Sequence, residues 1–373
     1  MKAVREIDSL NSLLRQKGQL NGAVVQGLSL SQAGVSWGEI ECKDAVFLGC
    51  EFPEGVGIED LIEKGASVFP SFPDLPYNPY RPRLYSREEM MEGWTEELDR
   101  SLDLRIYERF AERGRENPHI LEALAMRLHD HAIDDALADL LEGRVEKDGV
   151  KKVVGIMGGH SMGRDEEDFK RVARVAWRLA REGYFVATGG GPGVMEAGNL
   201  GAYLGAQDSE SLEWALQHIE AAPSYKDPEY ARLALDVIER FPTGTSSLAV
   251  PTWFYGHEPT NWFAQHVAKY FSNSLREDGL LAIATHGVIY ARGSAGTTQE
   301  VFMDACQNHY QTFEVESPMV FLGSDWFGER TGIYDVVARQ AGEKPYRQYM
   351  ALLDDEQQCV DFIKEHPPAR LSD

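Results

Sequence analysis

The chain has few cysteines and few positive charges, and both shortages narrow what it can be. Its 373 residues include four scattered cysteines, Cys42, Cys50, Cys306 and Cys359, and none forms a CxxC pair. This usage predicts reduced thiols. Lysines and arginines number 37 against 60 acidic residues, a formal charge of −23. Such a surface repels nucleic acid and anionic membranes, so we expect neither as a partner, although a local pocket can still bind a small anion.

Long apolar runs and several familiar catalytic motifs are also missing. No run is long enough to span a membrane, and "MKAVREIDSLNSLL" lacks the apolar core of a signal peptide, which predicts a cytoplasmic protein. There is no P-loop, HExxH motif or nucleophile elbow, and no lysine in a pyridoxal phosphate context. His129 and His131 would point about 200° apart on a helix, so they cannot share a metal ion. We expect no metal and no other cofactor.

What is present predicts two regions. Residues 1–150 begin with short strands ("GAVVQGLSL", "GVSWGEIEC", "DAVFLGCEF") and end in helix, including "ILEALAMRLHDHAIDDALADLLEG". We predict that they form an N-terminal α+β extension that covers or regulates the site. In residues 151–373, strands such as "KKVVGIMGG" and "YFVATGGG" alternate with helices such as "DEEDFKRVARVAWRLAREG". This alternation predicts an α/β, doubly wound, Rossmann-like parallel sheet.

Three glycine-rich turns follow predicted strands, at residues 155–163, 188–196 and 291–300. A glycine after a strand often only turns the chain. Three such turns in one parallel sheet, however, would line the same carboxyl edge, where open α/β sheets bind ligands. Helices that follow the turns offer unpaired N–H groups to an anion. The pattern therefore predicts a phosphate-bearing ligand, although "GIMGGHSMG" does not have the GxGxxG spacing of dinucleotide sites.

Two of these turns resemble the paired motifs of the LOG (lonely guy) family, long mislabelled as lysine decarboxylases. The hallmarks are GGGxxGxM and PGGxGTxxE turns, and they are specific when found together. The matching residues are Gly189, Gly190, Gly191, Gly193 and Met195 in the first and Gly293, Gly296, Thr297 and Glu300 in the second. The resemblance covers residues 150–325, and residues 1–150 resemble the extra N-terminal regions of larger bacterial nucleotide 5′-monophosphate nucleosidases.

The second motif departs from the family pattern at three positions. Arg292 replaces its proline, Ser294 replaces its second glycine, and Gln299 stands where many members carry the first of two glutamates. Serine can still donate to phosphate, and Arg292 would add charge to the pocket. The loss of one glutamate bears more on catalysis than on binding.

The resemblance implies hydrolysis of the N-glycosidic bond of a nucleoside 5′-monophosphate, giving free base and ribose 5-phosphate. Glu300 would stabilise the oxocarbenium-like transition state, with Arg276 and Glu196 as further catalytic candidates. The predicted substrate-binding residues are Gly190, Gly191, Gly193, Met195, Gly293, Ser294, Ala295, Gly296, Thr297, Ser161 and Asn261. Simpler roles remain open: Glu300 could satisfy a helix dipole, and Arg276 could pair in solvent with Glu277 or Asp278.

Two other classes of function compete with hydrolysis. A nucleotide- or cofactor-binding protein without chemistry fits the missing glutamate, and similar folds carry ligands such as molybdenum cofactor. A DNA-processing Rossmann protein is disfavoured by the charge of −23. Trp253, Tyr255 and Trp262 could stack on a base, although core packing is the commoner fate of such residues. The small-residue helix "GVMEAGNLGAYLGA" suits close packing, and with the resemblance it predicts a homodimer or larger homo-oligomer.

Overall fold

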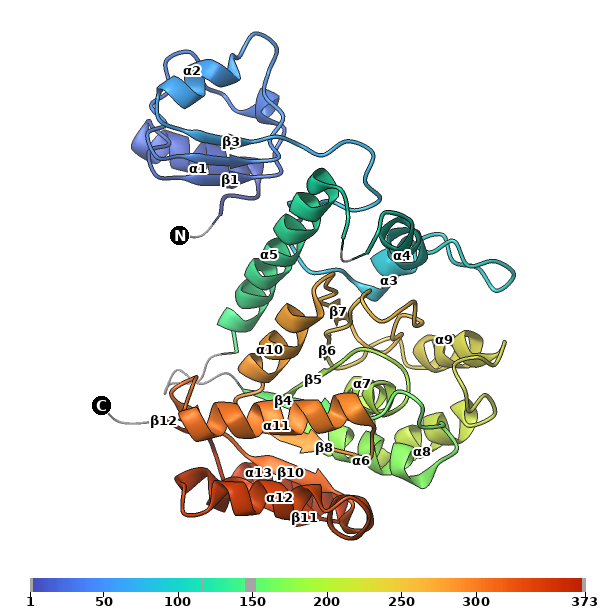
Figure 1. The fold of residues 1–373 in the computed structure, drawn as a ribbon. Helices are drawn as coiled ribbons and strands as arrows, with labels where there is room; N and C mark the ends of the chain where they lie inside the picture. Colours follow the sequence, from blue (N-terminus) through green and yellow to red (C-terminus); the bar gives the residue numbers. More distant parts are fainter. Residues whose placement is uncertain (1–2, 116, 145–151, 371–373) are drawn as a thin grey trace. The chain divides into compact units, whose positions relative to one another are not determined.

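The computed structural model describes residues 3–115, 117–144 and 152–370, which form two compact units (Figure 1). The first unit comprises Met1–Leu84 and Glu112–Ala136, and the second comprises Tyr85–Ala111 and Leu137–Asp373. The domain boundary predicted between residues 150 and 151 lies outside the described residues. No helix in these described ranges is long and apolar enough to cross a membrane.

The first unit contains a small parallel sheet of β1 (Val24–Gln26), β2 (Val46–Leu48) and β3 (Ser67–Phe69). Helices α1 (Ile7–Lys17) and α2 (Ile58–Glu63) accompany it. The strands predicted in "GAVVQGLSL" and "DAVFLGCEF" are confirmed. The strand predicted in "GVSWGEIEC" is wrong, because that segment forms turns. Its side chains are partly buried, as in a strand, but the amides of residues 39 and 40 bond back to the carbonyl of residue 36, which curls the backbone.

The second unit is built on a seven-stranded sheet in the order β11-β10-β8-β4-β5-β6-β7. Every neighbouring pair is parallel. The strands are β4 (Val153–Met157), β5 (Phe185–Thr188), β6 (Leu248–Ala249), β7 (His266–Val267), β8 (Val288–Tyr290), β10 (Met319–Leu322) and β11 (Met350–Leu353). The residues of β4, β5, β6, β8 and β10 are all buried, as a parallel sheet covered on both faces requires, whereas the edge strands β7 and β11 are partly exposed. The predicted Rossmann-like α/β fold is confirmed.

Helices cover the two faces of this sheet in a way that follows from the strand order. From β4 the chain passes through α6 to β5 on one side, and from β8 it passes through α11 to β10 on the other. Right-handed crossovers that run in opposite directions place their helices on opposite faces. Strands β4 and β8 are neighbours, so the order of the sheet reverses between them. The helices of the second unit are α3 (Arg87–Met90), α4 (Leu102–Glu112), α6 (Glu167–Arg181), α7 (Val194–Tyr203), α8 (Ser209–Ile219), α9 (Tyr230–Arg240), α10 (Asn273–Ile283), α11 (Ala295–Tyr310), α12 (Ile333–Ala341) and α13 (Glu356–Glu365). The residues of helix α5 (Ile120–Glu142) belong mostly to the first unit. A short antiparallel pair joins β9 (Val315–Glu316) to β12 (Ala369–Arg370).

The packing of α6 against α7 shows why these sequences form helices here. The predicted apolar stripe of α6 is buried, and the helix starts with acidic residues and ends with basic ones, which suits its dipole. Helix α7 is buried on all sides and contains small residues. A Cβ added at Gly201 would lie 2.0 Å from the carbonyl oxygen of Ala173, so only glycine permits this approach. The close packing fixes the beginning of α7 at the carboxyl edge of the sheet.

Candidate functional site

The three glycine-rich turns meet at the carboxyl edge, where the strand order reverses. The amide of Gly159, after β4, donates to the carbonyl of Arg292 at 3.0 Å, and the amide of Val194 donates to the carbonyl of Gly159 at 3.1 Å. A Cβ on Gly159 would lie 3.1 Å from Cα of Gly293, and a Cβ on Gly193 would lie 2.4 Å from the Gly159 oxygen. Side chains here would push the turns apart. The reversal point of a doubly wound sheet is also the usual ligand site of the fold.

Helix α11 begins at this edge with an exposed first turn. Its N-cap residue Ser294 and the next two residues, Ala295 and Gly296, are exposed. The first hydrogen bond within the helix is donated by the amide of Thr298 to the carbonyl of Ser294, at 3.1 Å. The amides that precede this bond have no partner inside the helix. A Cβ on Gly296 would meet nothing within 4 Å, whereas Thr297 is buried and packs against Gly293. The turn is therefore open to an anion on its outer side.

Glu300 and Arg276 form a buried ion pair beside the same turns. Nη1 of Arg276 lies 3.3 Å from Oε1 of Glu300, and the two residues are 9% and 8% exposed. Arg276 also donates to the carbonyls of Val250 at 2.8 Å and Gly189 at 3.4 Å, which fixes it over the ends of β6 and β5. A Cβ on Gly189 would lie 2.2 Å from Nη2 of Arg276. The first glycine of the GGG turn thus makes room for the arginine.

Burial and charge act in opposite directions on Glu300. Burial raises the pKa of its carboxyl group, Arg276 lowers it, and the negative charge of Glu277 raises it again. Below Glu300 on α11, Asp304 accepts a 2.8 Å hydrogen bond from the Tyr290 hydroxyl, and burial raises the pKa of Asp304 to about 7. The charge of Asp304 therefore depends on pH close to neutrality.

Arg292 does not leave a free charge in the pocket, contrary to the expectation from sequence. Its guanidinium pairs with the carboxylates of Glu166 and Asp168, at the start of α6, with 3.3 Å between Nε and Oδ2 of Asp168. The replacement of the motif proline by arginine therefore joins the β8 turn to α6. It adds little net charge for a ligand.

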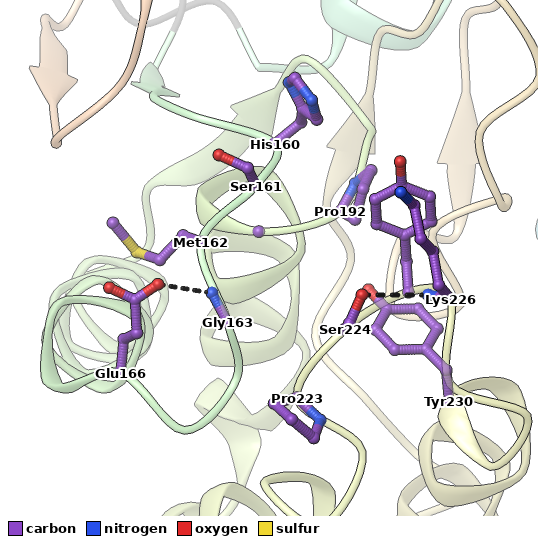
Figure 2. A pocket seen from close by; sticks show the side chains of 12 residues that line it. His160, Ser161, Met162, Gly163, Glu166, Pro192, Pro223, Ser224, Lys226 and Tyr230 are labelled. Atoms are coloured by element: carbon purple, nitrogen blue, oxygen red, sulfur yellow. Dashed lines mark hydrogen bonds between the residues drawn. The ribbon is translucent and has the colours of Figure 1, made fainter.

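A cavity of about 360 Å³ lies next to Gly193 (Figure 2). Figure 2 shows His160 and Ser161 on one wall and Lys226 and Tyr230 on the other, with Pro192 between them. The Glu166 carboxylate in this cavity accepts a 2.8 Å bond from the Gly163 amide and pairs with Arg292. Its complete lining is His160, Ser161, Met162, Gly163, Glu166, Pro192, Gly193, Pro223, Ser224, Tyr225, Lys226 and Tyr230. Glu166 is the one carboxylate among the described residues of this lining, and its charge is balanced by Arg292. The positive charge of Lys226 therefore remains available to an anionic ligand.

Glu196 lies beneath this cavity with protein partners on both of its oxygens. Arg164 binds the carboxylate through Nη2 and through Nε, the latter at 3.0 Å from Oε2. The Tyr230 hydroxyl donates to the same Oε2 at 2.6 Å. Arg164 stacks on the Tyr230 ring at 3.4 Å and is 1% exposed, and Glu196 is 2% exposed. These contacts favour a structural role for Glu196, which anchors α9 to the turn after β4.

The predicted binding residues Asn261 and Met195 also lie within protein contacts. Asn261 donates to the side chain of Asn199 at 2.9 Å and accepts from the amide of Phe263 at 3.1 Å. Sδ of Met195 accepts from the amide of Gly191 at 3.4 Å. Both residues therefore hold the GGG turn and α7 in place. Ser161, in contrast, is exposed in the cavity.

The aromatic residues near this edge divide between core and surface. Trp253 is fully buried and donates to Asp103 at 2.7 Å, and Trp262 is 8% exposed and packs edge-on against Trp94. Tyr255 is 69% exposed, and its hydroxyl accepts a 2.9 Å bond from Asn273, at the start of α10. Of the three aromatics considered for base stacking, Tyr255 is the accessible one. Among the described residues, no group of three or more His, Cys, Asp or Glu is arranged to hold a metal ion.

Sequence reasoning missed several buried acidic residues, including Asp304, Asp103 and Glu277. Asp103 binds Trp253, Thr260 and Lys269, all more than 145 positions away in the chain, and no motif marks it. Glu277 was considered only as a surface partner for Arg276. It is 6% exposed and accepts a 2.6 Å hydrogen bond from Gln299. The change of a motif glutamate to Gln299 was the signal that could have led to Glu277.

Fold and site together define a Rossmann-like α/β protein with a glycine-lined carboxyl edge and a buried Arg–Glu pair. Residues 151–208 match the profile of the SLOG (SMF/DprA–LOG) cluster4 family. The predicted resemblance to LOG-type Rossmann proteins is thereby confirmed for this part of the chain. Comparison with curated proteins found no match.

Several solved structures are similar to this chain over 57% of its length. They include a molybdenum cofactor binding protein from Rippkaea orientalis (16% identity, 95% of that chain covered, TM-score 0.35). The molybdenum cofactor carrier protein of Chlamydomonas reinhardtii is similar, with 14% identity, 95% of that chain covered and a TM-score of 0.37. The protein TM1055 has 15% identity, 99% of that chain covered and a TM-score of 0.36.

Proposed function

We propose that this protein hydrolyses the N-glycosidic bond of a nucleoside 5′-monophosphate. The observation that carries the proposal is the Arg276–Glu300 pair. The glutamate is on α11, whose exposed first turn offers unpaired amides to an anion, and the arginine is held over the ends of β5 and β6. One helix can thus bind the phosphate at its start and present a carboxylate to the ribose six residues later.

The reaction breaks the bond between C1′ and the base nitrogen. Water adds its oxygen to C1′, and a proton passes to the departing base. Positive charge grows on the ribose as the bond lengthens, and an ionised Glu300 stabilises this charge in a site that excludes most water. Arg276 has two functions here, because its charge opposes the effect of burial on the pKa of Glu300 and its guanidinium holds the carboxylate in place.

The cavity next to Gly193 fits the remainder of such a ligand. At about 360 Å³ it is at the small end of ligand pockets, which suits a mononucleotide rather than a polymer. The serine hydroxyls and Lys226 at its walls provide polar contacts, and Tyr225 provides an aromatic surface. We infer that these residues contribute to the choice of base, since no shared motif fixes them.

The test is a panel of purified mononucleotides, with free base measured by chromatography. We expect Glu300→Gln to lower kcat on the order of 10²–10³-fold and to change mononucleotide binding little, because the amide keeps the shape and loses the charge. Glu239→Gln, which makes the same change on an exposed part of α9, is the matched control. If Glu300→Gln retains the wild-type rate, the assignment is wrong.

A second comparison tests the phosphate site. Adenosine should be a poor substrate beside AMP, because phosphate contacts distant from C1′ position the bond that breaks. Equal rates for the two would contradict the proposal.

Binding without chemistry is the alternative function, and two observations favour it. Burial raises the pKa of Glu300, which works against the charged form, and Gln299 replaces a motif glutamate. Tight binding of a mononucleotide in calorimetry with no base released would support this alternative.

A further inference from the structure

A carboxylate occupies the space between α10 and α11 although the motif there has lost one. Gln299 stands at the position of the first motif glutamate, and its Nε2 donates to Oε2 of Glu277 at 2.6 Å. Glu277 directly follows Arg276 on α10 and is 6% exposed. The carboxylate at this place therefore comes from α10, whereas the family motif carries it on α11, and the Gln299–Glu277 bond joins the two helices.

A buried carboxylate is costly unless it is paired, so its position calls for a reason. Glu277 lies close enough to Glu300 and to Tyr255 for its charge to raise the pKa of both groups. The guanidinium of Arg276 pairs with Glu300, and Glu277 adds a second carboxylate whose charge reaches Glu300, which leaves net negative charge at this place. Such charge favours a cation next to it, as the ribosyl transition state would be.

We propose that Glu277 is a positioning residue for Glu300. Its carboxylate takes the place of the missing motif glutamate, ties α10 to the first turns of α11 through Gln299, and adds a second negative charge beside the Arg276–Glu300 pair. The inference rests on the proposed function, because the gain from this charge is greatest when a cation forms on the ribose.

Several other charged or titratable groups lie near Glu300. Arg276 comes from α10, and Tyr255 comes from the loop after β6. Tyr290 of β8 lies 3.5 Å from the Glu300 carbonyl and binds Asp304, one turn further along α11. Each of these stays in place when only Glu277 is changed.

The experiment compares Glu277→Gln with the wild type over a range of pH. The glutamine can still accept the bond from Gln299, so the helices stay joined while the charge is lost. We expect kcat to fall roughly tenfold, less than for Glu300→Gln, because the charge acts from further away. The acidic limb of the kcat profile should move to lower pH, since a neighbouring negative charge no longer holds the proton on Glu300. The control is Asp278→Asn, which removes one negative charge from the exposed residue next to Glu277.

A charge exchange sharpens this test. Gln299→Glu alone brings two carboxylates together at the 2.6 Å contact and should lower kcat. The double variant, Glu277→Gln with Gln299→Glu, returns the charge to α11 and should recover much of the rate and the original pH profile. A merely structural Glu277 would lower Tm in Glu277→Gln and leave the profile unmoved, and that result would overturn the proposal.

A separate readout keeps this inference distinct from the proposed function. The carboxyl carbon of Glu300 can be followed by NMR in protein labelled at glutamate, with Glu300→Gln for assignment. Glu277→Gln should move this titration to lower pH in the unliganded protein, whether or not any nucleotide is hydrolysed. An unchanged titration would refute the role of Glu277. Absence of hydrolysis with a moved titration would refute only the enzymatic proposal.

Discussion

The change Glu196→Gln distinguishes a structural anchor from a catalytic carboxylate. Both oxygens of Glu196 are used by Arg164 and Tyr230, and the side chains of Glu196 and Arg164 are 3% and 1% exposed. Glutamine keeps the size but removes the charge, and it turns one acceptor into a donor that faces the Arg164 guanidinium. The buried arginine is then left without its counter-ion.

The expected loss of stability is large. Removing one partner of a buried ion pair costs about 3–5 kcal/mol, because the remaining charge stays buried and unpaired. At about 2–4 °C per kcal/mol for a domain of this size class, Tm should fall by about 6–20 °C. Calorimetry measures this directly, with Glu239→Gln as the exposed control. Below the unfolding temperature, kcat for a mononucleotide should stay within a few-fold of wild type.

A double variant separates the ion pair from the other contacts of Arg164. Arg164→Met together with Glu196→Gln removes both charges, so it should cost less than the sum of the single changes. Some cost remains, because Arg164 also donates to the Tyr230 carbonyl at 3.0 Å. If Glu196→Gln keeps the wild-type Tm and abolishes turnover, Glu196 is catalytic and the structural argument fails.

Three further predictions address other parts of the site. Gly189→Ala should displace Arg276 and lower kcat at least tenfold, since the added Cβ would lie 2.2 Å from Nη2, whereas Gly279→Ala, where no atom lies within 4 Å, should leave kcat unchanged. Asp304, whose pKa burial raises to about 7, holds a proton in the folded state that the unfolded chain loses near pH 4. Stability should therefore fall as pH rises from about 4 to 7, and Asp304→Asn should flatten the plot of Tm against pH; an equal slope in both proteins would contradict this. We also propose a homodimer or larger homo-oligomer, and a strictly monomeric mass in light scattering at micromolar concentration would refute it.

The class of fold, and the sheet edge that carries the candidate site, could be predicted from the sequence alone. Alternating strand and helix patterns with glycines at strand ends correspond to β4, α6, β5, α7, β8 and α11 of the structure. These predictions were correct because the patterns are local. Each apolar helix stripe and each buried strand can be recognised from a few consecutive residues. The strand prediction for "GVSWGEIEC" was wrong for a different reason. Buried residues also occur in turns, and burial alone does not fix the backbone.

The pairing of Glu300 with Arg276 was only partly within reach of the sequence. A resemblance singled out both residues, but their distance of 3.3 Å and their burial depend on the packing of α10 beside α11. The same motif could not show that Arg292 would be used by Glu166 and Asp168, because those partners lie more than 120 positions earlier in the chain.

Which carboxylates have no other protein partners becomes visible only in the folded chain. Glu196 stands in a motif but has its oxygens bound by Arg164 and Tyr230, 32 and 34 positions away. Glu277 stands in no motif, yet folding brings it against Gln299, 22 positions away. The physical reason is that the charge and reactivity of a buried carboxylate are set by its desolvation and its partners, and both come from parts of the chain that meet only when it folds.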